Sequence, residues 1–141
     1  MKLPSKQVQI AYYTALNGNV TYNSAEVPVY DVVPTASSYP YIVLGDQIIN
    51  DRPSTKDSFI TDVTMQVDVV TGFEGNYGGK SQMYDISSDV TDIIRTRVPL
   101  SLTGFTMITS TLDLASIIVE QTDTHILYIN RIRFRHLIQE I

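Results

Sequence analysis

The segment that most resembles a chemical motif is Gly75-Asn76-Tyr77-Gly78-Gly79-Lys80-Ser81, which lies between a predicted strand and a predicted helix. In that setting a P-loop wraps its backbone amides around phosphate at the amino end of the helix. The spacing fails, because a Walker sequence ending in Gly79-Lys80-Ser81 requires glycine where Glu74 stands. A carboxylate there would also repel phosphate. We therefore interpret the segment as a glycine-rich connection, and a nucleotide-binding enzyme is the weakest of the alternatives.

Two sets of side chains have the chemistry of metal ligands, but neither has the right arrangement. The only histidines, His125 and His136, fall on opposite faces of one predicted strand and so cannot share an ion within one chain. Asp85, Asp89 and Asp92 lie near one line of a predicted helix and lack the tight loop of calcium sites. We expect one histidine at a turn, one at a packing seam, and a solvated acidic helix face. The sequence predicts no catalytic residue, no cofactor and no metal site.

A row of arginines is the charge feature that most needs an explanation. Arg131, Arg133 and Arg135 occupy alternate positions of a predicted strand, which places their side chains about 7 Å apart. Such a row suits carboxylates on a partner or the phosphates of passing DNA, whereas the alternative is a solvated outer face that discourages strand pairing. No acid lies between the arginines, so their mutual repulsion needs an explanation, and both alternatives stay open. The acidic helix of another copy is one candidate partner.

Composition narrows the classes of protein that remain. With 141 residues, the chain has the length of one domain, and 43% hydrophobic and 18% charged residues are typical of a globular protein. A net charge of -5 disfavours general attraction to DNA, and the absence of cysteine excludes disulfides. There is no apolar run long enough to span a membrane and no apolar signal segment. We expect the chain to be cytosolic, or to be assembled in a cytosol.

Hydrophobic periodicity predicts an α+β fold. The stretch from Phe59 to Val69 alternates between apolar and polar residues, which indicates a strand of a mostly antiparallel sheet that is apolar on one side. Amphipathic helices are predicted from Ser5, as N-cap, to Leu16 and from Ser81 to Arg97, and both would cover that side. Shorter strands are predicted over 27–33, 41–44 and 47–50, and the glycine-rich residues 71–80 are predicted to be irregular. A long hairpin, 105–120 with 125–139, ends the chain.

This order of elements resembles the tail-completion or tail-terminator (head-tail joining) family of tailed bacteriophages. The resemblance covers nearly the whole chain. It rests on five features: the first helix, the Tyr39–Gly45 strand, the Thr64–Val70 strand, the Met83–Ile94 helix and the terminal hairpin with Arg133-Phe134-Arg135. It implies that residues 1–141 form a single domain of this type, in which residues 72–80 are a glycine-rich insertion loop that is longer than expected.

The resemblance further implies a structural virion protein without catalytic activity. Members form rings, usually of six subunits, and a ring of twelve is the alternative. Such a ring would lie at the neck or tail end, joining the head or portal to the tail. Its neighbours would be portal, adaptor or tail-tube proteins, with genomic DNA passing close by and no membrane involved. We expect assembly in the host bacterial cytoplasm. The residues expected at the interface are the arginine row, the acidic helix residues, Gly75 and Tyr77, and a monomeric adaptor is the main alternative.

Overall fold

The chain folds as a long twisted sheet with two helices on one side. A computed structural model describes residues 1–52, 58–75 and 78–141. Its elements in chain order are α1 (Ser5–Leu16), β1 (Thr21–Tyr22), β2 (Ala25–Glu26), β3 (Val29–Tyr30), β4 (Tyr41–Arg52), β5 (Ile60–Glu74), α2 (Ser81–Ile94), β6 (Phe105–Gln121) and β7 (His125–Glu140). The main sheet has the strand order β3-β4-β5-β7-β6, in which only the β3–β4 pair is parallel. The predicted α+β class and terminal hairpin are confirmed.

Strand β5 lies at the centre of this sheet and shows the predicted alternation. Val63, Met65, Val67 and Val69 are fully buried, while the residues between them keep some contact with solvent. Phe59 lies one residue before the strand and is 43% exposed, so the buried series does not include it. Thr61 is buried within the series, and its hydroxyl donates a hydrogen bond to the backbone oxygen of Ile138.

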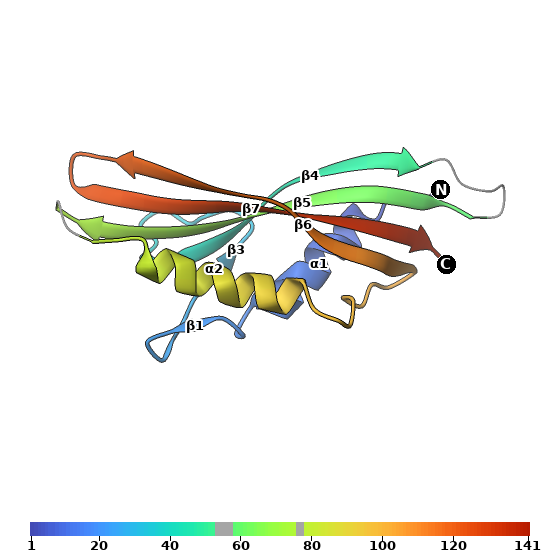
Figure 1. Cartoon of the computed structure of the whole chain (residues 1–141), viewed down its shortest axis with the longest axis horizontal. Helices are drawn as coiled ribbons and strands as arrows, with labels where there is room; N and C mark the ends of the chain where they lie inside the picture. The colour runs from blue at the N-terminus through green and yellow to red at the C-terminus, as the bar shows by residue number, and fades with distance from the viewer. Residues whose placement is uncertain (53–57, 76–77) are drawn as a thin grey trace.

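Both helices cover the face of the sheet to which these valines point, and Figure 1 shows them together below the strands. Helix α1 contacts β4, and α2 contacts β5 and β7. The two helices bury apolar residues at helical spacing, as amphipathic helices do. The buried positions are Val8, Ala11, Tyr12 and Leu16 in α1, and Met83, Ile86, Ser87, Val90 and Ile94 in α2.

The helix ends differ slightly from the prediction. Pro4, rather than Ser5, occupies the N-cap of α1, and no side chain caps that end. Helix α2 stops at Ile94 with Arg95 as its C-cap, so the helix ends three residues before the predicted end at Arg97. Neither helix, and no other in the described part of the chain, is both long and apolar enough to cross a bilayer.

Strands β4 and β5 both extend through glycines at which the sequence predicts a strand to end. The sequence predicts a strand over 41–44 that Gly45-Asp46 ends, with 47–50 as a brief extension, but β4 runs continuously through Gly45 with a register shift between Leu44 and Gln47. Similarly, β5 continues to Glu74, so residues 72–74 of the predicted insertion loop are strand and pair with β7. The ring of Tyr39 lies over Gly72, where a β-carbon would come within 2.7 Å of the Tyr39 Cδ2 atom. Glycine is therefore needed there for close packing rather than for a turn.

Candidate functional site

The arginine row lies on the face of the sheet that the helices leave open. Arg131, Arg133 and Arg135 alternate along β7 with the buried residues Ile132 and Phe134, so their side chains point away from the core. Because β7 lies between β5 and β6, the row runs along the interior of the sheet rather than along an edge.

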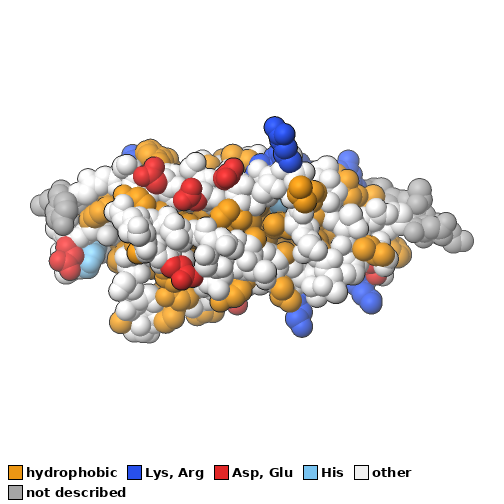
Figure 2. Space-filling model, turned by 90° about the horizontal axis from the view of Figure 1, so that it is seen from below, with side chains coloured by type: hydrophobic (Ala, Val, Ile, Leu, Met, Phe, Trp, Pro, Cys, Tyr) orange, Lys and Arg blue, Asp and Glu red, His pale blue; other side chains and the backbone are white. Residues whose placement is uncertain are grey.

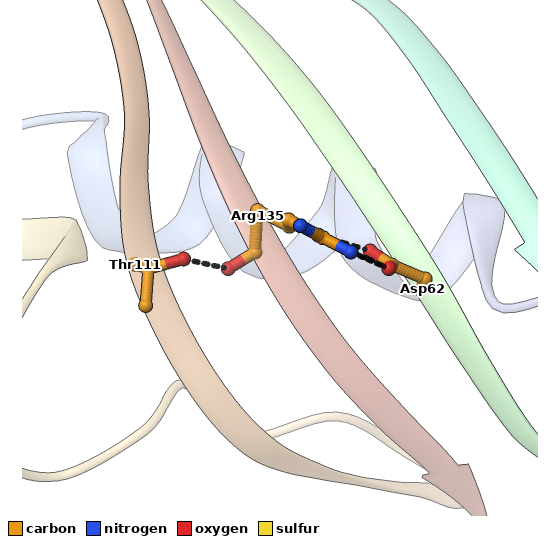
Figure 3. A network of polar contacts seen from close by, with 3 residues as sticks. All are labelled: Asp62, Thr111 and Arg135. Atoms are coloured by element: carbon orange, nitrogen blue, oxygen red, sulfur yellow. Dashed lines mark hydrogen bonds and ion pairs between the residues drawn. The ribbon is translucent and has the colours of Figure 1, made fainter. Parts of the chain in front are cut away.

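Each arginine has a partner on the neighbouring strand β5. The Arg131 Nε lies 3.4 Å from a carboxylate oxygen of Asp68, and the Arg133 Nε lies 3.4 Å from the Gln66 side-chain oxygen. The Arg135 guanidinium donates through two nitrogens to the carboxylate of Asp62 (Figure 3). The carbonyl of Arg135 also accepts a hydrogen bond from the Thr111 hydroxyl, at 3.3 Å, so this contact joins β5, β7 and β6.

The two carboxylates respond differently to their arginines. The hydrogen bond from Arg135 lowers the pKa of Asp62 and outweighs the small effect of its burial. The pKa of Asp68 is raised instead, because burial disfavours its charged form more than Arg131 and Gln66 favour it. Asp62 therefore belongs to the better matched of the two ion pairs.

These contacts explain how one chain tolerates three neighbouring arginines. No acid separates the arginines along β7, but Asp62 and Asp68 offset their charge from the next strand, so an external partner is not required. The signal was present in the sequence, because both aspartates lie on the polar face of the alternating strand. What was missing was the pairing of β5 with β7. A role of the arginine row in a subunit interface stays a prediction.

The acidic row lies on the opposite side of the molecule. Asp85, Asp89 and Asp92 are exposed on α2, which packs against the helix-covered face of the sheet. On that side the acidic side chains lie mostly in the left half of Figure 2 and the basic ones mostly in the right half. The arginine row and the acidic row of one copy therefore face different directions and cannot both meet the same surface of one neighbour.

Gly75 lies where β5 ends, beside the turn of the terminal hairpin. Its backbone N–H donates to the Thr124 carbonyl oxygen at 3.0 Å, and its φ of 75° is readily adopted only by glycine. Tyr77, the other predicted interface residue here, lies outside the described residues, as does Asn76. Lys80 directly precedes α2. Within the described ranges, no group of three His, Cys, Asp or Glu side chains could hold a metal ion.

The two histidines lie where a turn and a packing seam were expected. His125 is partly exposed and begins β7. His136 is fully buried, its Nε2 shares a hydrogen bond with the Tyr12 hydroxyl, and burial lowers its pKa to about 4. Burial likewise raises the pKa of Tyr12 well above its usual value. The pair ties α1 to β7, and the sequence carried no signal that linked residues so far apart.

The second half of β6, Thr111–Gln121, exposes apolar side chains that the helices do not cover. Leu112, Ile117 and Val119 point to the helix-covered face but are between 41% and 51% exposed, because α2 does not reach them. A groove of about 480 Å³ runs between α2 and this strand, from Tyr84 to Ala115. Two buried polar atoms that line it, Ser87 Oγ and Asn130 Oδ1, have no hydrogen-bond partner among the described residues.

Comparison with known proteins identifies the family of this chain. The family described as "Tail completion protein gp17" matches residues 13–137. The tail completion protein gp17 of Bacillus phage SPP1 is 38% identical over 85 residues, which cover 58% of this chain and 56% of that protein. The chain thus matches a little over half the length of that relative.

A solved structure shares the fold over almost the entire chain. A chain in the structure titled "Virion of native gene transfer agent (GTA) particle" superposes with a TM-score of 0.79 and 16% sequence identity, covering 99% of each chain. At that identity the likeness is one of fold. The family match spans most of the sequence, so this chain belongs to the tail completion protein gp17 family, whose members are structural proteins of phage tails rather than enzymes.

Proposed function

We propose that this chain is a virion protein that forms a ring with copies of itself at the neck or tail end and joins the head or portal to the tail. The family and the shared fold support a structural role in the tail. The ring, its position and its neighbours, a portal or adaptor protein on one side and a tail-tube protein on the other, are our inference. Assembly in the host cytoplasm belongs to the same proposal.

The main observation in support of a ring is that the second half of β6 is exposed. An edge strand with apolar side chains on both faces is an aggregation hazard for a solitary protein, and such edges are normally blunted or covered. Leu114 and Leu112 are each 47% exposed on opposite faces of this strand. A ring covers such a surface in every copy, because a cyclic assembly repeats one contact between two unlike surfaces.

The arginine row has a limited part in this proposal. Arg131 and Arg135 are already paired with Asp68 and Asp62. The net positive charge of the row is therefore smaller than three arginines alone would give, and so is its attraction to DNA. Genomic DNA enters the proposal only as a molecule that passes near the ring. Arg133 has the neutral Gln66 as its partner and is therefore the arginine best placed to contact a neighbour.

Particles that carry the chain provide the test. Cryo-electron microscopy with the chain labelled should show a ring at the neck or tail end, and cross-linking with mass spectrometry should connect it to portal, adaptor or tail-tube proteins. A single copy bound to one neighbour would instead support a monomeric adaptor. A chain missing from purified particles would overturn the proposal.

The predicted interface residues can be tested in the same particles. Replacing Arg133 with glutamate reverses one charge without breaking either aspartate pair, so its effect on incorporation reports on contacts outside the chain. Asp89→Lys likewise reverses one charge on α2, and its effect on incorporation reports on contacts that α2 makes outside the chain. We expect both substitutions to lower incorporation. Normal incorporation of either variant would remove its row from the interface.

A further inference from the structure

Two strand edges are open on opposite sides of the sheet. Strand β6 ends the strand order, and no described strand pairs with its outer side. At the other side β3 pairs with β4 only at Ile42 and Val43, which leaves Asp46–Arg52 of β4 with β5 alone as its described neighbour. Each open edge carries backbone N–H and C=O groups that can pair with another chain.

The directions of these strands suit a head-to-tail contact between copies. Each of the pairs β4–β5, β5–β7 and β7–β6 is antiparallel, so β4 and β6 run in opposite directions. If a second copy in the same orientation is set beside the first, β6 of one lies antiparallel to β4 of the other. The antiparallel alternation of the sheet then continues across the contact, and every copy in a ring can repeat the same contact.

The two open segments lie at different heights along the strands. The middle of the β4 segment, Ile49, is level with His136 of β7, whereas the middle of the β6 segment, Ser116, is level with Arg131. Five residues of β7 separate these levels, a displacement of about 17 Å along the strands. The four strands β4, β5, β7 and β6 are together about 19 Å wide. A displacement of about 17 Å over that width corresponds to strands tilted by about 40° from the axis of the ring, a tilt within the range of closed barrels.

This displacement also brings unlike charges together. The half of the molecule near the hairpin turn carries Asp85, Asp89 and Asp92 on α2. The other end carries exposed basic residues: Arg52 at the end of β4, and Lys2 and Lys6 beside Glu140. Figure 2 shows this separation along the long axis of the helix side. A copy displaced by about this distance sets its basic end beside the acidic half of its neighbour, which favours this partner over repulsive alternatives.

We propose that Thr111–Gln121 of β6 pairs, edge to edge and antiparallel, with Asp46–Arg52 of β4 in the next copy, so that the sheets of neighbouring subunits form one continuous sheet. The inference rests on the ring of the proposed function and specifies its contact. The next copy covers Leu112, Ile117 and Val119 and closes one end of the groove beside α2.

Disulfide cross-linking in assembled particles tests this contact. The chain has no cysteine of its own, so the introduced residues are the only cysteines in each subunit. Ile48 and Ser116 both point to the face that carries the arginines, since they are level with Thr64 and Arg131 of that face. Ile48→Cys is combined in turn with Leu114→Cys, Ser116→Cys and Ile118→Cys, which all lie on that face. Within one chain β5 and β7 separate these positions, so no internal bridge can form.

We expect at least one of the three combinations to give a ladder of covalent oligomers on oxidation. Ile48→Cys with Ile117→Cys is the matched control, because Ile117 points to the opposite face and should not cross-link. If the chains assemble and none of the three combinations cross-links, this contact is wrong while the proposed ring stands. If the unmodified chain is absent from particles, the proposed function itself fails.

A second kind of variant tests the same contact if the double-cysteine variants assemble poorly. Leu114→Lys places a charge on the open edge of β6 without touching the core, and it should lower incorporation at least tenfold while leaving urea unfolding of the free chain unchanged. Val98→Lys, at a position 76% exposed in the loop after α2, is the control and should incorporate normally. Incorporation of the Leu114→Lys chain at the unmodified level would overturn the proposal.

Discussion

The two strands of the terminal hairpin have similar lengths but different environments. Strand β7 has a partner on each side and helices beneath it, and its even-numbered residues from Asn130 to Ile138 are buried. Strand β6 has one partner, and only its first half, with Phe105, Met107 and Ser110, is buried. A strand shows clean alternation where one face meets a core and the other meets water. The second half of β6 meets neither a core nor a helix, so its apolar residues are free to serve a contact outside the chain.

The largest expected difference is between Phe134 and Leu112, which face each other across the β7–β6 ladder. Phe134 is fully buried, so Phe134→Ala should lower the free energy of unfolding by about 3 to 5 kcal/mol. Leu112 is 47% exposed, and Leu112→Ala should cost about 1 kcal/mol or less in the free chain. Urea unfolding measures both. Similar costs for the two substitutions would show that β6 belongs to the core of the free chain.

The next largest expected effect is a dependence of stability on pH, and it arises in β7, because β6 contains no histidine. The pKa of His136 is about 4 in the folded chain and about 6.5 when unfolded, so between these values the unfolded state binds the extra proton. Stability should therefore fall as the pH drops from about 6.5 towards 4, by up to about 1.4 kcal/mol per pH unit. Urea unfolding at several pH values measures this slope.

His136→Gln should remove the slope, because glutamine can still hydrogen-bond to Tyr12 but carries no proton in this range. His125→Gln removes the other imidazole, from a site that water reaches, and is the matched control. A slope that survives in the His136→Gln chain would assign it to another group.

A smaller effect is expected at Gly72, which faces Leu127 of β7 near the hairpin turn. Gly72→Ala would place a methyl group against the ring of Tyr39, which stacks on Tyr41 with ring centroids 5.4 Å apart. We expect a loss of about 1 to 3 kcal/mol, as for other overpacked sites. Gly79→Ala adds a methyl group in open space and should have little effect. In a double-mutant cycle, Tyr39→Ala should relieve most of the loss, and additive costs would argue against the clash.

The smallest effect concerns the open face of β7. Arg135→Gln should raise the pKa of Asp62, because that arginine is the main cause of its lowered value. The stabilisation from this pair is present above about pH 4 and is lost as the pH falls through the lowered pKa. NMR titration of the Asp62 carboxyl group measures the change. Thr111→Val removes only the hydrogen bond from β6 to the Arg135 backbone, and it should leave the titration unchanged.

Local pattern was enough to predict the elements that follow one periodicity without a break. The alternation of β5, the apolar stripe of α2 and the turn between β6 and β7 all depend on residues that are near in sequence. Predictions failed where glycine was taken as a sign of irregular backbone. Gly45 and Gly72 lie inside strands, and in the case of Gly72 the cause is a ring from Tyr39, more than thirty positions away.

The sequence alone determined the two faces of β5 and β7, the position of the arginine row on one face of β7, and the family to which the chain belongs. Only the tertiary structure decided that β7 lies beside β5, so that Asp62 and Asp68 offset the arginines, and that β6 lies at an edge with half its length uncovered. The physical reason is that periodicity records which side of a strand is buried. Strand order and register depend on contacts between residues far apart in the chain, and no local pattern encodes them.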